Sequence, residues 1–365
     1  MKTIVKAAAL LAAALAFSPI SLWSQTGEKK YTEAFELTLT GKLFTDTPNP
    51  YHRVDTLVHK GFTKSENLQV RESSGIAVAF RTNTSSIYVK TVWGYASNPT
   101  NTNAFSARGY DLYIKTENGW MFAGAGAASL SKLDKPLLIA ENLTPGYKEC
   151  LLYLPTYSEE YSVQIGIDKD ADIHALENPF RHRIAIFGSS YTHGSSTSRA
   201  GMTYPAQFSR STGLQLLSLG CSGNSKLQSY FADVLAAAKV DAIILDAFSN
   251  PSAQMIEERL FPFIEKLQSA HPDIPIIFQK TIFRERRMFN TKAEQYESEK
   301  MAMADSLMSI ACKKYKNIYY IEPTATSPDH SATVDGVHPS NYGYTLWAES
   351  IEKPVKRILK KYGIK

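Results

Sequence analysis

A serine follows directly on a predicted buried strand in the middle of the chain. Residues 183–187 (RIAIF) have the apolar pattern of a strand, and the small-residue turn 188–194 (GSSYTHG) comes next. This order puts the hydroxyl of Ser190 at the carboxyl end of a strand, beside backbone N–H groups that a following helix leaves free. A serine in such a turn can act as a nucleophile or can simply cap the helix. The turn alone leaves both interpretations open.

An aspartate stands three residues before a histidine near the other end of the chain. Asp335 and His338 belong to the segment 335–339 (DGVHP), which precedes an amphipathic stretch over residues 342–351. At this spacing the carboxylate can accept the Nδ1–H of the imidazole and leave Nε2 free to take a proton from a serine. The alternative is a surface turn capped by Asp335, with His338 merely exposed. Of the eight histidines, His338 alone has an aspartate at this spacing.

Two more turns follow predicted parallel strands between these ends. The turn 219–224 (LGCSGN) contains Gly223, and the turn 248–251 (FSNP) contains Asn250. Backbone N–H groups of the first and the side-chain amide of the second could point at an oxyanion, because open α/β sheets gather their sites at the carboxyl ends of strands. Taken singly, each is an ordinary loop.

The elements that must position these residues change character along the chain. Residues 31–167 contain short alternating or aromatic-rich runs separated by polar turns, which is typical of an all-β sandwich or jelly roll. Beyond residue 178, apolar strands alternate with helical stretches, which predicts an α/β fold with a parallel sheet. We therefore expect a β-sandwich domain over residues 26–178 and a second domain over residues 179–365.

In the order Ser, Gly, Asn, Asp-x-x-His, the four segments together resemble the sequence blocks of the SGNH (GDSL-like) hydrolase superfamily. The resemblance covers residues 182–360 and is closest to the branch with G-[TS]-S-x-T-x-G, SGN and D-G-x-H-P blocks. Upstream, the segment 109–113 (GYDLY) is similar to the GxDLY segment of the β-domain that accompanies this branch. The resemblance implies a flavodoxin-like three-layer α/β hydrolase domain with a parallel sheet, preceded by a jelly-roll-like β-sandwich.

The resemblance also implies a role for each residue. Ser190 would be the nucleophile, His338 the base and Asp335 the residue that orients it. The oxyanion hole would consist of the Ser190 N–H, the Gly223 N–H and the Asn250 amide. The chain departs from the family pattern at two places: Ser189 replaces the aspartate of GDSL, and Asn250 lacks the usual GxND surroundings.

The expected activity is that of a serine esterase. Hydrolysis would run through an acyl-enzyme, with no metal and no organic cofactor. We expect short-chain O-acyl esters as substrates, above all O-acetyl groups on carbohydrates, or another small ester. The alternatives are a non-catalytic glycan-binding protein, and an acyltransferase, lipase or thioesterase that uses the same triad. The acyl length, the glycan and the oligomeric state stay open.

The N-terminus predicts export. Lys2 and Lys6 precede an apolar run over residues 7–17, and small residues follow near Ser24, which is the layout of a secretory signal peptide over residues 1–24. The apolar run is too short to span a membrane, so we expect cleavage and a periplasmic or extracellular protein with no membrane span. The net charge of +5 is spread along the chain and gives no reason to expect nucleic acid as a partner.

Residues outside the predicted triad and oxyanion hole also carry expectations. The three widely spaced cysteines, Cys150, Cys221 and Cys312, are predicted to be buried thiols in the core. Tyr191 and His193 are expected to line the pocket or to lie on a helix surface. The loop cluster Arg284, Arg286 and Arg287 is expected to be a solvated face, with binding of an acidic sugar as the alternative. Trp93 and Trp120 are expected to pack in the β-domain core, with stacking on a sugar ring as the alternative.

Overall fold

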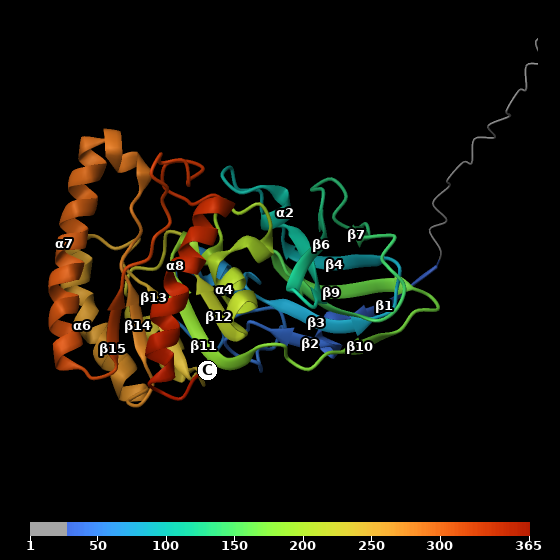
Figure 1. Ribbon diagram of the computed structural model, residues 1–365, viewed down its shortest axis with the longest axis horizontal. Coiled ribbons are helices and arrows are strands. Elements are labelled where there is room, and N and C mark those ends of the chain that lie inside the picture. The colour runs from blue at the N-terminus through green and yellow to red at the C-terminus, as the bar shows by residue number, and fades with distance from the viewer. Residues whose placement is uncertain (1–27) are drawn as a thin grey trace, which may run out of the picture.

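Strands of two different kinds occupy the two halves of the chain. The computed structural model describes residues 28–365, so the predicted signal peptide lies outside the described residues. Antiparallel strands occur up to residue 175, and parallel strands begin at residue 181. Figure 1 shows the antiparallel half on the right and the parallel sheet with its long helices on the left. The predicted boundary at residues 178 and 179 lies in the segment between the two.

The antiparallel half is a sandwich of two sheets, as predicted. One sheet has the strand order β1-β9-β4-β7, and the other has the order β10-β3-β8-β5-β6 with β2 paired to β3. The strands are β1 (Lys29–Glu33), β2 (Thr38–Thr40), β3 (Ala77–Thr82), β4 (Ile87–Tyr95), β5 (Gly109–Thr116), β6 (Gly119–Ala127), β7 (Leu137–Ala140), β8 (Lys148–Tyr153), β9 (Glu159–Asp168) and β10 (Ile173–Ala175). Three short helical segments join them, η1 (Ala34–Glu36), α1 (Lys64–Gln69) and α2 (Ala104–Ala107).

Strand β3 is buried between the other sheet of the sandwich and the α/β half. Its side chains alternate between the two faces of the sheet. Val78 and Phe80 point into the sandwich core, while Ala77 and Ala79 belong to a second cluster that includes Ala206 of the parallel half. Both faces of β3 are therefore buried, one by the other sheet and one by the α/β half.

The parallel half has a five-stranded sheet in the order β12-β11-β13-β14-β15. This is the doubly wound order in which the first strand lies between the second and the third, so the α/β prediction is confirmed. The strands are β11 (Arg181–Gly188), β12 (Leu214–Gly220), β13 (Ala242–Asp246), β14 (Ile276–Gln279) and β15 (Ile318–Ile321). The helical segments are α3 (Ser190–His193), η2 (Ala200–Met202), α4 (Tyr204–Thr212), α5 (Ser229–Ala237), α6 (Ala253–Ala270), η3 (Glu285–Phe289), α7 (Thr291–Lys314) and α8 (Asn341–Lys360).

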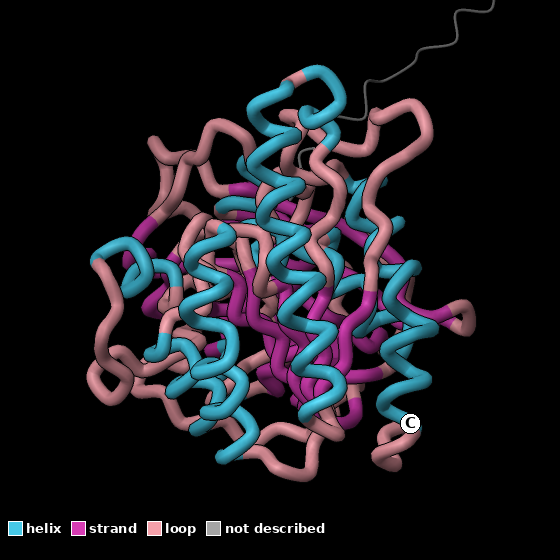
Figure 2. Tube along the Cα trace, turned by 90° about the vertical axis from the view of Figure 1, so that its left-hand side faces the viewer, coloured by secondary structure: helices cyan, strands magenta, loops and turns pink. Residues whose placement is uncertain are grey.

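Helices cover both faces of this sheet, because its strands are apolar on both sides. Alternate residues of β11 show the division: Phe187 packs into the cluster with α5, α6 and α7, and Ile186 packs into the cluster with α4 and α8. Figure 2 shows the strands of the sheet behind helices. The result is a three-layer arrangement with Ser190 at the carboxyl end of the strand where the strand order reverses. None of the described helices is long and apolar enough to cross a membrane.

A segment of the N-terminal half belongs to the core of the α/β half. Within residues 41–76, which link β2 and β3, Leu43, Val54 and Val70 join the same buried cluster as Phe187, while Tyr51 and Ile76 stay in the sandwich core. In this segment the fully buried guanidinium of Arg53 donates a hydrogen bond of 2.7 Å to the Glu72 carbonyl. The two halves therefore share a core as well as a surface.

The GxDLY segment forms another joint between the halves. It lies in β5, and the Asp111 carboxylate accepts the Gly201 N–H at 2.9 Å and lies 3.3 Å from the Arg199 guanidinium. Burial raises the pKa of Asp111, although Arg199 and the Gly201 N–H oppose the rise. The motif thus ties the sandwich to η2.

The close approach of the two halves at Gly75 yields a prediction. Gly75 has a φ of +87°, and a Cβ there would lie 2.4 Å from the Ser218 Cβ on β12. We expect Gly75→Ala to lower the free energy of unfolding by about 1–3 kcal/mol more than Gly146→Ala does. Gly146 is a matched control, because its φ is +91° and a Cβ there would meet nothing within 4 Å. Urea denaturation of both variants measures the difference, and equal losses would contradict the close packing of the halves.

Candidate active site

Ser190 lies where β11 passes into the short helix α3. Its neighbour Ser189 is the residue that caps the helix, and the Ser189 hydroxyl accepts the Tyr191 N–H at 3.2 Å. The capping interpretation therefore applies to Ser189, and the hydroxyl of Ser190 is left for another partner. Gly188 has to be a glycine here, since a Cβ would lie 2.1 Å from the Thr192 hydroxyl oxygen.

The partner of Ser190 is His338, which lies 148 residues further along the chain. The Ser190 Oγ is 3.0 Å from His338 Nε2, and His338 Nδ1 is 2.8 Å from an Asp335 carboxylate oxygen. The other carboxylate oxygen of Asp335 accepts the His338 backbone N–H at 2.7 Å. One carboxylate therefore holds both the backbone and the ring of the histidine, and the three predicted side chains form a continuous hydrogen-bonded chain.

The electrostatics of Asp335 suit this arrangement. Partial burial opposes ionisation, but hydrogen bonds from the backbone and ring of His338 outweigh it and lower the pKa of Asp335 below its ordinary value. Tyr191 supports the imidazole from another side, with its ring centroid 5.7 Å from that of His338 in an edge-to-face arrangement. The charged carboxylate and the packed ring together fix the orientation of His338.

Gly223 and Asn250 lie in turns at the same edge of the sheet. Gly223 is exposed, with a φ of +72°, in the turn after β12, and Asn250 is half-buried in the turn after β13. Within residues 28–365, neither makes a hydrogen bond to Ser190. The Asn250 Oδ1 is buried without a hydrogen-bond partner in the described structure.

Two family models match this chain, one in each half. Residues 181–356 match the GDSL-like lipase/acylhydrolase family, and residues 29–173 match the N-terminus of SGNH-hydrolase-type esterases. A crystal structure of a GDSL-like lipase from Bacteroides ovatus shares 37% sequence identity, with a TM-score of 0.87 over 91% of this chain and 98% of that one.

The chain belongs to the GDSL-like lipase/acylhydrolase family.

Two further structures share the fold of this acylhydrolase at lower identity. A salicylyl-acyltransferase from a tetracycline biosynthetic pathway has 18% identity and a TM-score of 0.69, with 90% of this chain and 97% of that one covered. A family two carbohydrate esterase from Cellvibrio japonicus has 12% identity and a TM-score of 0.59, with 91% and 98% covered. Among curated protein sequences, none matches significantly.

Asp246, at the end of β13, joins two turns of the acylhydrolase site. Its fully buried carboxylate accepts the Ser189 N–H at 3.0 Å, the Ser189 hydroxyl at 2.6 Å and the Ser249 hydroxyl. Burial raises the pKa of Asp246, although these hydrogen bonds oppose the rise. The sequence analysis missed this residue. The sequence did contain a signal for it, because Asp246 is a polar residue directly after the apolar residues 242–245 of a predicted strand.

The turn that contains Asn250 is also held by two cations. Arg284 and Lys300 both donate to the Ser249 carbonyl, and both form ion pairs of 2.5 Å with Glu297. All three charged side chains are almost fully buried. The prediction of a solvated arginine face is therefore wrong for Arg284, because Glu297 and the carbonyl satisfy its charge inside the protein.

His193 holds the turn that precedes Gly223. Its Nδ1 accepts the Ser222 N–H at 3.3 Å, its Nε2 lies 2.9 Å from a Glu72 carboxylate oxygen, and its ring stacks on Tyr157 at 4.1 Å. His193 and Tyr191 are fully buried. The helix-surface interpretation of both residues is therefore wrong. The N-terminal half covers His193, and Tyr191 packs against Trp347 of α8 inside the α/β half.

Three remaining expectations have mixed outcomes. Cys150 and Cys221 are buried free thiols as predicted, but Cys312 is exposed on α7, so its predicted burial is wrong. The apolar neighbours of α7 lie on its other face. Trp93 is half-buried against the sandwich core, in agreement with the packing interpretation, whereas Trp120 is half-buried against the cluster that the sandwich shares with the α/β half.

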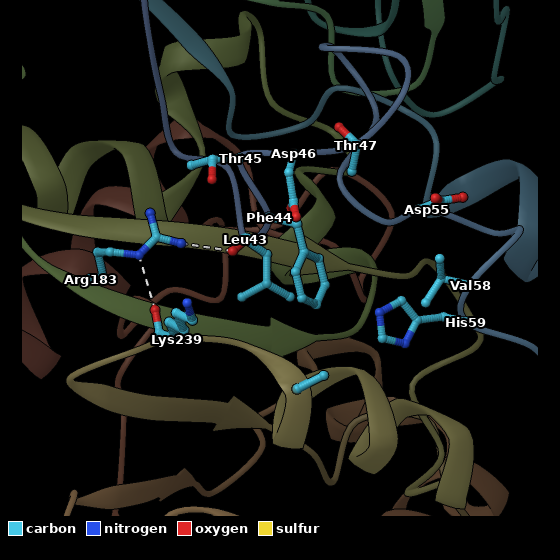
Figure 3. A pocket seen from close by; sticks show the side chains of 11 residues that line it. Leu43, Phe44, Thr45, Asp46, Thr47, Asp55, Val58, His59, Arg183 and Lys239 are labelled. Carbon is cyan, nitrogen blue, oxygen red and sulfur yellow. Dashed lines mark hydrogen bonds between the residues drawn. The ribbon is translucent and has the colours of Figure 1, made fainter.

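A pocket of about 370 Å³ lies at the other end of β11 from Ser190. Figure 3 shows Arg183, Lys239, Asp46 and His59 around it. Arg183 donates hydrogen bonds to the Leu43 and Lys239 carbonyls, so its guanidinium links the two halves. This pocket lies at the amino ends of the strands, whereas sheets of this kind bind ligands at the carboxyl ends. The Ser190 edge is therefore the candidate site.

Glu285 anchors the segment that leads to Asp335 and His338. Its carboxylate accepts the Ala332 and Thr333 N–H groups at 3.0 Å each, and the Thr326 and Thr333 hydroxyls at 2.8 and 2.6 Å. Desolvation opposes ionisation, but these four hydrogen bonds outweigh it and lower the pKa of Glu285 below its ordinary value of 4.5. The ionised carboxylate therefore stabilises this segment.

The lowered pKa of Glu285 gives a pH prediction. At neutral pH we expect Glu285→Gln to reduce the free energy of unfolding by about 1–3 kcal/mol, since an amide cannot accept four such bonds. A carboxyl group with a depressed folded-state pKa stabilises the fold above its unfolded pKa and loses this effect as the pH falls. The difference between wild type and variant should therefore shrink below pH 4.5. Urea unfolding at several pH values measures it, and a difference that is constant down to pH 3 would contradict the assignment.

Proposed function

We propose that this protein is an exported esterase that removes short O-acyl groups, chiefly acetyl groups, from carbohydrates by a Ser-His-Asp mechanism. The observation that supports the proposal most is the hydrogen-bonded chain from Ser190 through His338 to Asp335, with distances of 3.0 and 2.8 Å. Membership of an acylhydrolase family fixes the general reaction class. The carbohydrate part rests on the shared fold with a family two carbohydrate esterase.

In this mechanism His338 is the base and Ser190 the nucleophile. His338 Nε2 takes the hydroxyl proton as Ser190 Oγ attacks the ester carbonyl carbon. The protonated imidazole then gives that proton to the sugar oxygen that leaves as the C–O bond breaks, so that the sugar departs with a free hydroxyl. Water, activated by the same histidine, hydrolyses the acyl-enzyme. The Asp335 carboxylate keeps the proton on Nδ1 and stabilises the imidazolium, because it accepts from that nitrogen at 2.8 Å.

The oxyanion would meet the Ser190 N–H, the Gly223 N–H and the Asn250 amide. The turns that hold these donors are fixed by buried contacts, through Asp246 to the Ser189 and Ser249 side chains and through His193 to the Ser222 N–H. Donors that are held in place before the reaction need no reorganisation when charge develops, and each can lower the barrier by about 3 kcal/mol. The rigid support of these turns favours catalysis over glycan binding alone.

Acyl transfer is the second candidate, because the fold is shared with a salicylyl-acyltransferase at a TM-score of 0.69. The same acyl-enzyme would then react with an alcohol in place of water. The two candidates differ in the fate of the acyl group, so the ratio of free acid to transferred ester in the presence of an acceptor alcohol distinguishes them.

The triad predicts a non-additive pattern of activity loss. We expect Ser190→Ala and His338→Ala each to lower kcat on 4-nitrophenyl acetate by about 10³-fold or more, with the double variant hardly worse, because the two residues act as one unit. Asp335→Asn should cost less, since the base remains. Steady-state kinetics measure these effects, with Ser131→Ala as control because its exposed hydroxyl contacts only Ser129. Additive losses, or an active Ser190→Ala variant, would refute the triad.

The absence of a long apolar segment near the motifs predicts a short acyl pocket. Residues 191–202 and 283–296 are polar, aromatic and basic, whereas a long chain needs apolar cover worth about 0.8 kcal/mol per methylene. We expect kcat/KM on 4-nitrophenyl esters to fall from acetate to octanoate, and acetylated sugars to be cleaved while emulsified triglycerides are not. Faster turnover of octanoate would favour a lipase or thioesterase instead.

A further inference from the structure

A hollow of about 740 Å³ lies beside His338, between a loop of the sandwich and the α/β half. One wall is the loop 98–104, which precedes and enters α2. The other wall consists of residues 196–198 after α3 and residues 340–342 at the start of α8, and Val334 also lines the hollow. Residues from three distant parts of the chain thus meet at this place.

The hollow adjoins the catalytic histidine on the side away from Ser190. The side-chain nitrogen of Asn101 lies 3.4 Å from His338 Nδ1, and the Val334 N–H donates to the His338 carbonyl at 2.8 Å. Ser190 approaches the imidazole at Nε2, and Asn101 approaches it at Nδ1. The alcohol part of an ester bound at Ser190 would therefore reach this hollow by passing around the ring of His338. The hollow is therefore placed for a group that extends beyond the scissile bond.

Hydrogen bonds fix both walls. The Ser196 hydroxyl donates to the Asn101 carbonyl at 2.8 Å, and the Ser196 N–H donates to the Thr102 hydroxyl at 2.9 Å. On the other wall, the Asn341 side chain accepts the Ser198 N–H at 2.9 Å and donates to the Ser198 hydroxyl at 2.6 Å. A ligand that binds here does not have to order the walls, which reduces the entropy cost of binding.

None of the residues that line the hollow is charged, and most of them have an amide or a hydroxyl group. Among the described hydrogen bonds, the hydroxyls of Thr100 and Tyr342 have no partner, and the Tyr342 side chain is exposed at the rim with 53% of its surface accessible. The nearby Arg108 donates to the Asn98 side chain and the Ser97 carbonyl and does not line the hollow. By contrast, the pocket at Arg183 has both acidic and basic side chains in its lining.

This lining fits one ligand class. A neutral sugar unit offers hydroxyl groups to amides and hydroxyls, and an apolar ring face to an exposed tyrosine. An acidic sugar would find no cation in the lining, and an acyl chain would find little apolar surface. We infer that this hollow is a subsite for an uncharged sugar unit of the substrate, so that the loop 98–104 of the sandwich selects the alcohol part of the ester. The inference rests on the proposed esterase function.

Two variants test the subsite. We expect Tyr342→Ala and Thr100→Val to raise KM for acetylated xylo-oligosaccharides by roughly tenfold more than they change KM for 4-nitrophenyl acetate, because stacking and hydrogen bonding to a second sugar unit are lost only with the sugar substrate. Tyr161→Ala is the matched control, since Tyr161 is a comparably exposed tyrosine, at 54%, on β9. It should change neither value.

Binding without turnover separates failure of the subsite from failure of the proposed function. Calorimetric titration of the wild type with non-acetylated xylotetraose should show binding that Tyr342→Ala weakens about tenfold, while an oligosaccharide of galacturonic acid binds more weakly. This result supports the subsite even if no acetyl group is released. Equal KM changes on both esters, no effect of either variant on sugar binding, or tighter binding of the acidic oligosaccharide would overturn the subsite, whether or not 4-nitrophenyl acetate is hydrolysed.

Discussion

The geometry of the site depends on one buried carboxylate. Asp246 accepts hydrogen bonds from the backbone and hydroxyl of Ser189 and from the hydroxyl of Ser249, and so joins the turn before Ser190 to the turn before Asn250. Burial of a carboxylate is costly unless its hydrogen bonds are satisfied, so its contribution is specificity of geometry more than net stability. The chain has Ser189 where GDSL sequences have an aspartate, and here the carboxylate next to that position comes from the neighbouring strand.

The sandwich and the α/β half form one structural unit around this edge. Three residues of the N-terminal half contact the other half near the site. Glu72 pairs with His193, Asn101 lies beside His338, and Asp111 accepts the Gly201 N–H. Residues 41–76 also contribute apolar side chains to the α/β core. The sandwich therefore has a direct part in shaping the surroundings of Ser190, and its loops cannot move far without disturbing the histidine.

The carboxylates around the site divide into two groups by environment. Asp335 and Glu285 have their pKa values lowered, because hydrogen bonds from backbone and side chains outweigh desolvation. Asp246 is fully buried, and burial raises its pKa. This division favours negative charge at Asp335, where the proposed mechanism has an imidazolium to stabilise, while the buried Asp246 accepts hydrogen bonds from Ser189 and Ser249.

The sequence by itself determined the features that depend only on residues close together in the chain. Apolar strands that end in small polar turns placed Ser190, Gly223 and Asn250 at one edge of a parallel sheet, and the spacing of Asp335 and His338 gave their mutual hydrogen bonds, because both are local properties of the chain. Only the tertiary structure decided which residues come together over long separations. The separation of 148 positions between Ser190 and His338 is closed within the α/β half, and the separation of 237 between Asn101 and His338 is closed by packing of the two halves. No local pattern exists for either. The burial of Arg284 and His193 and the exposure of Cys312 were decided in the same way, since a side chain's environment depends on which surfaces pack over it.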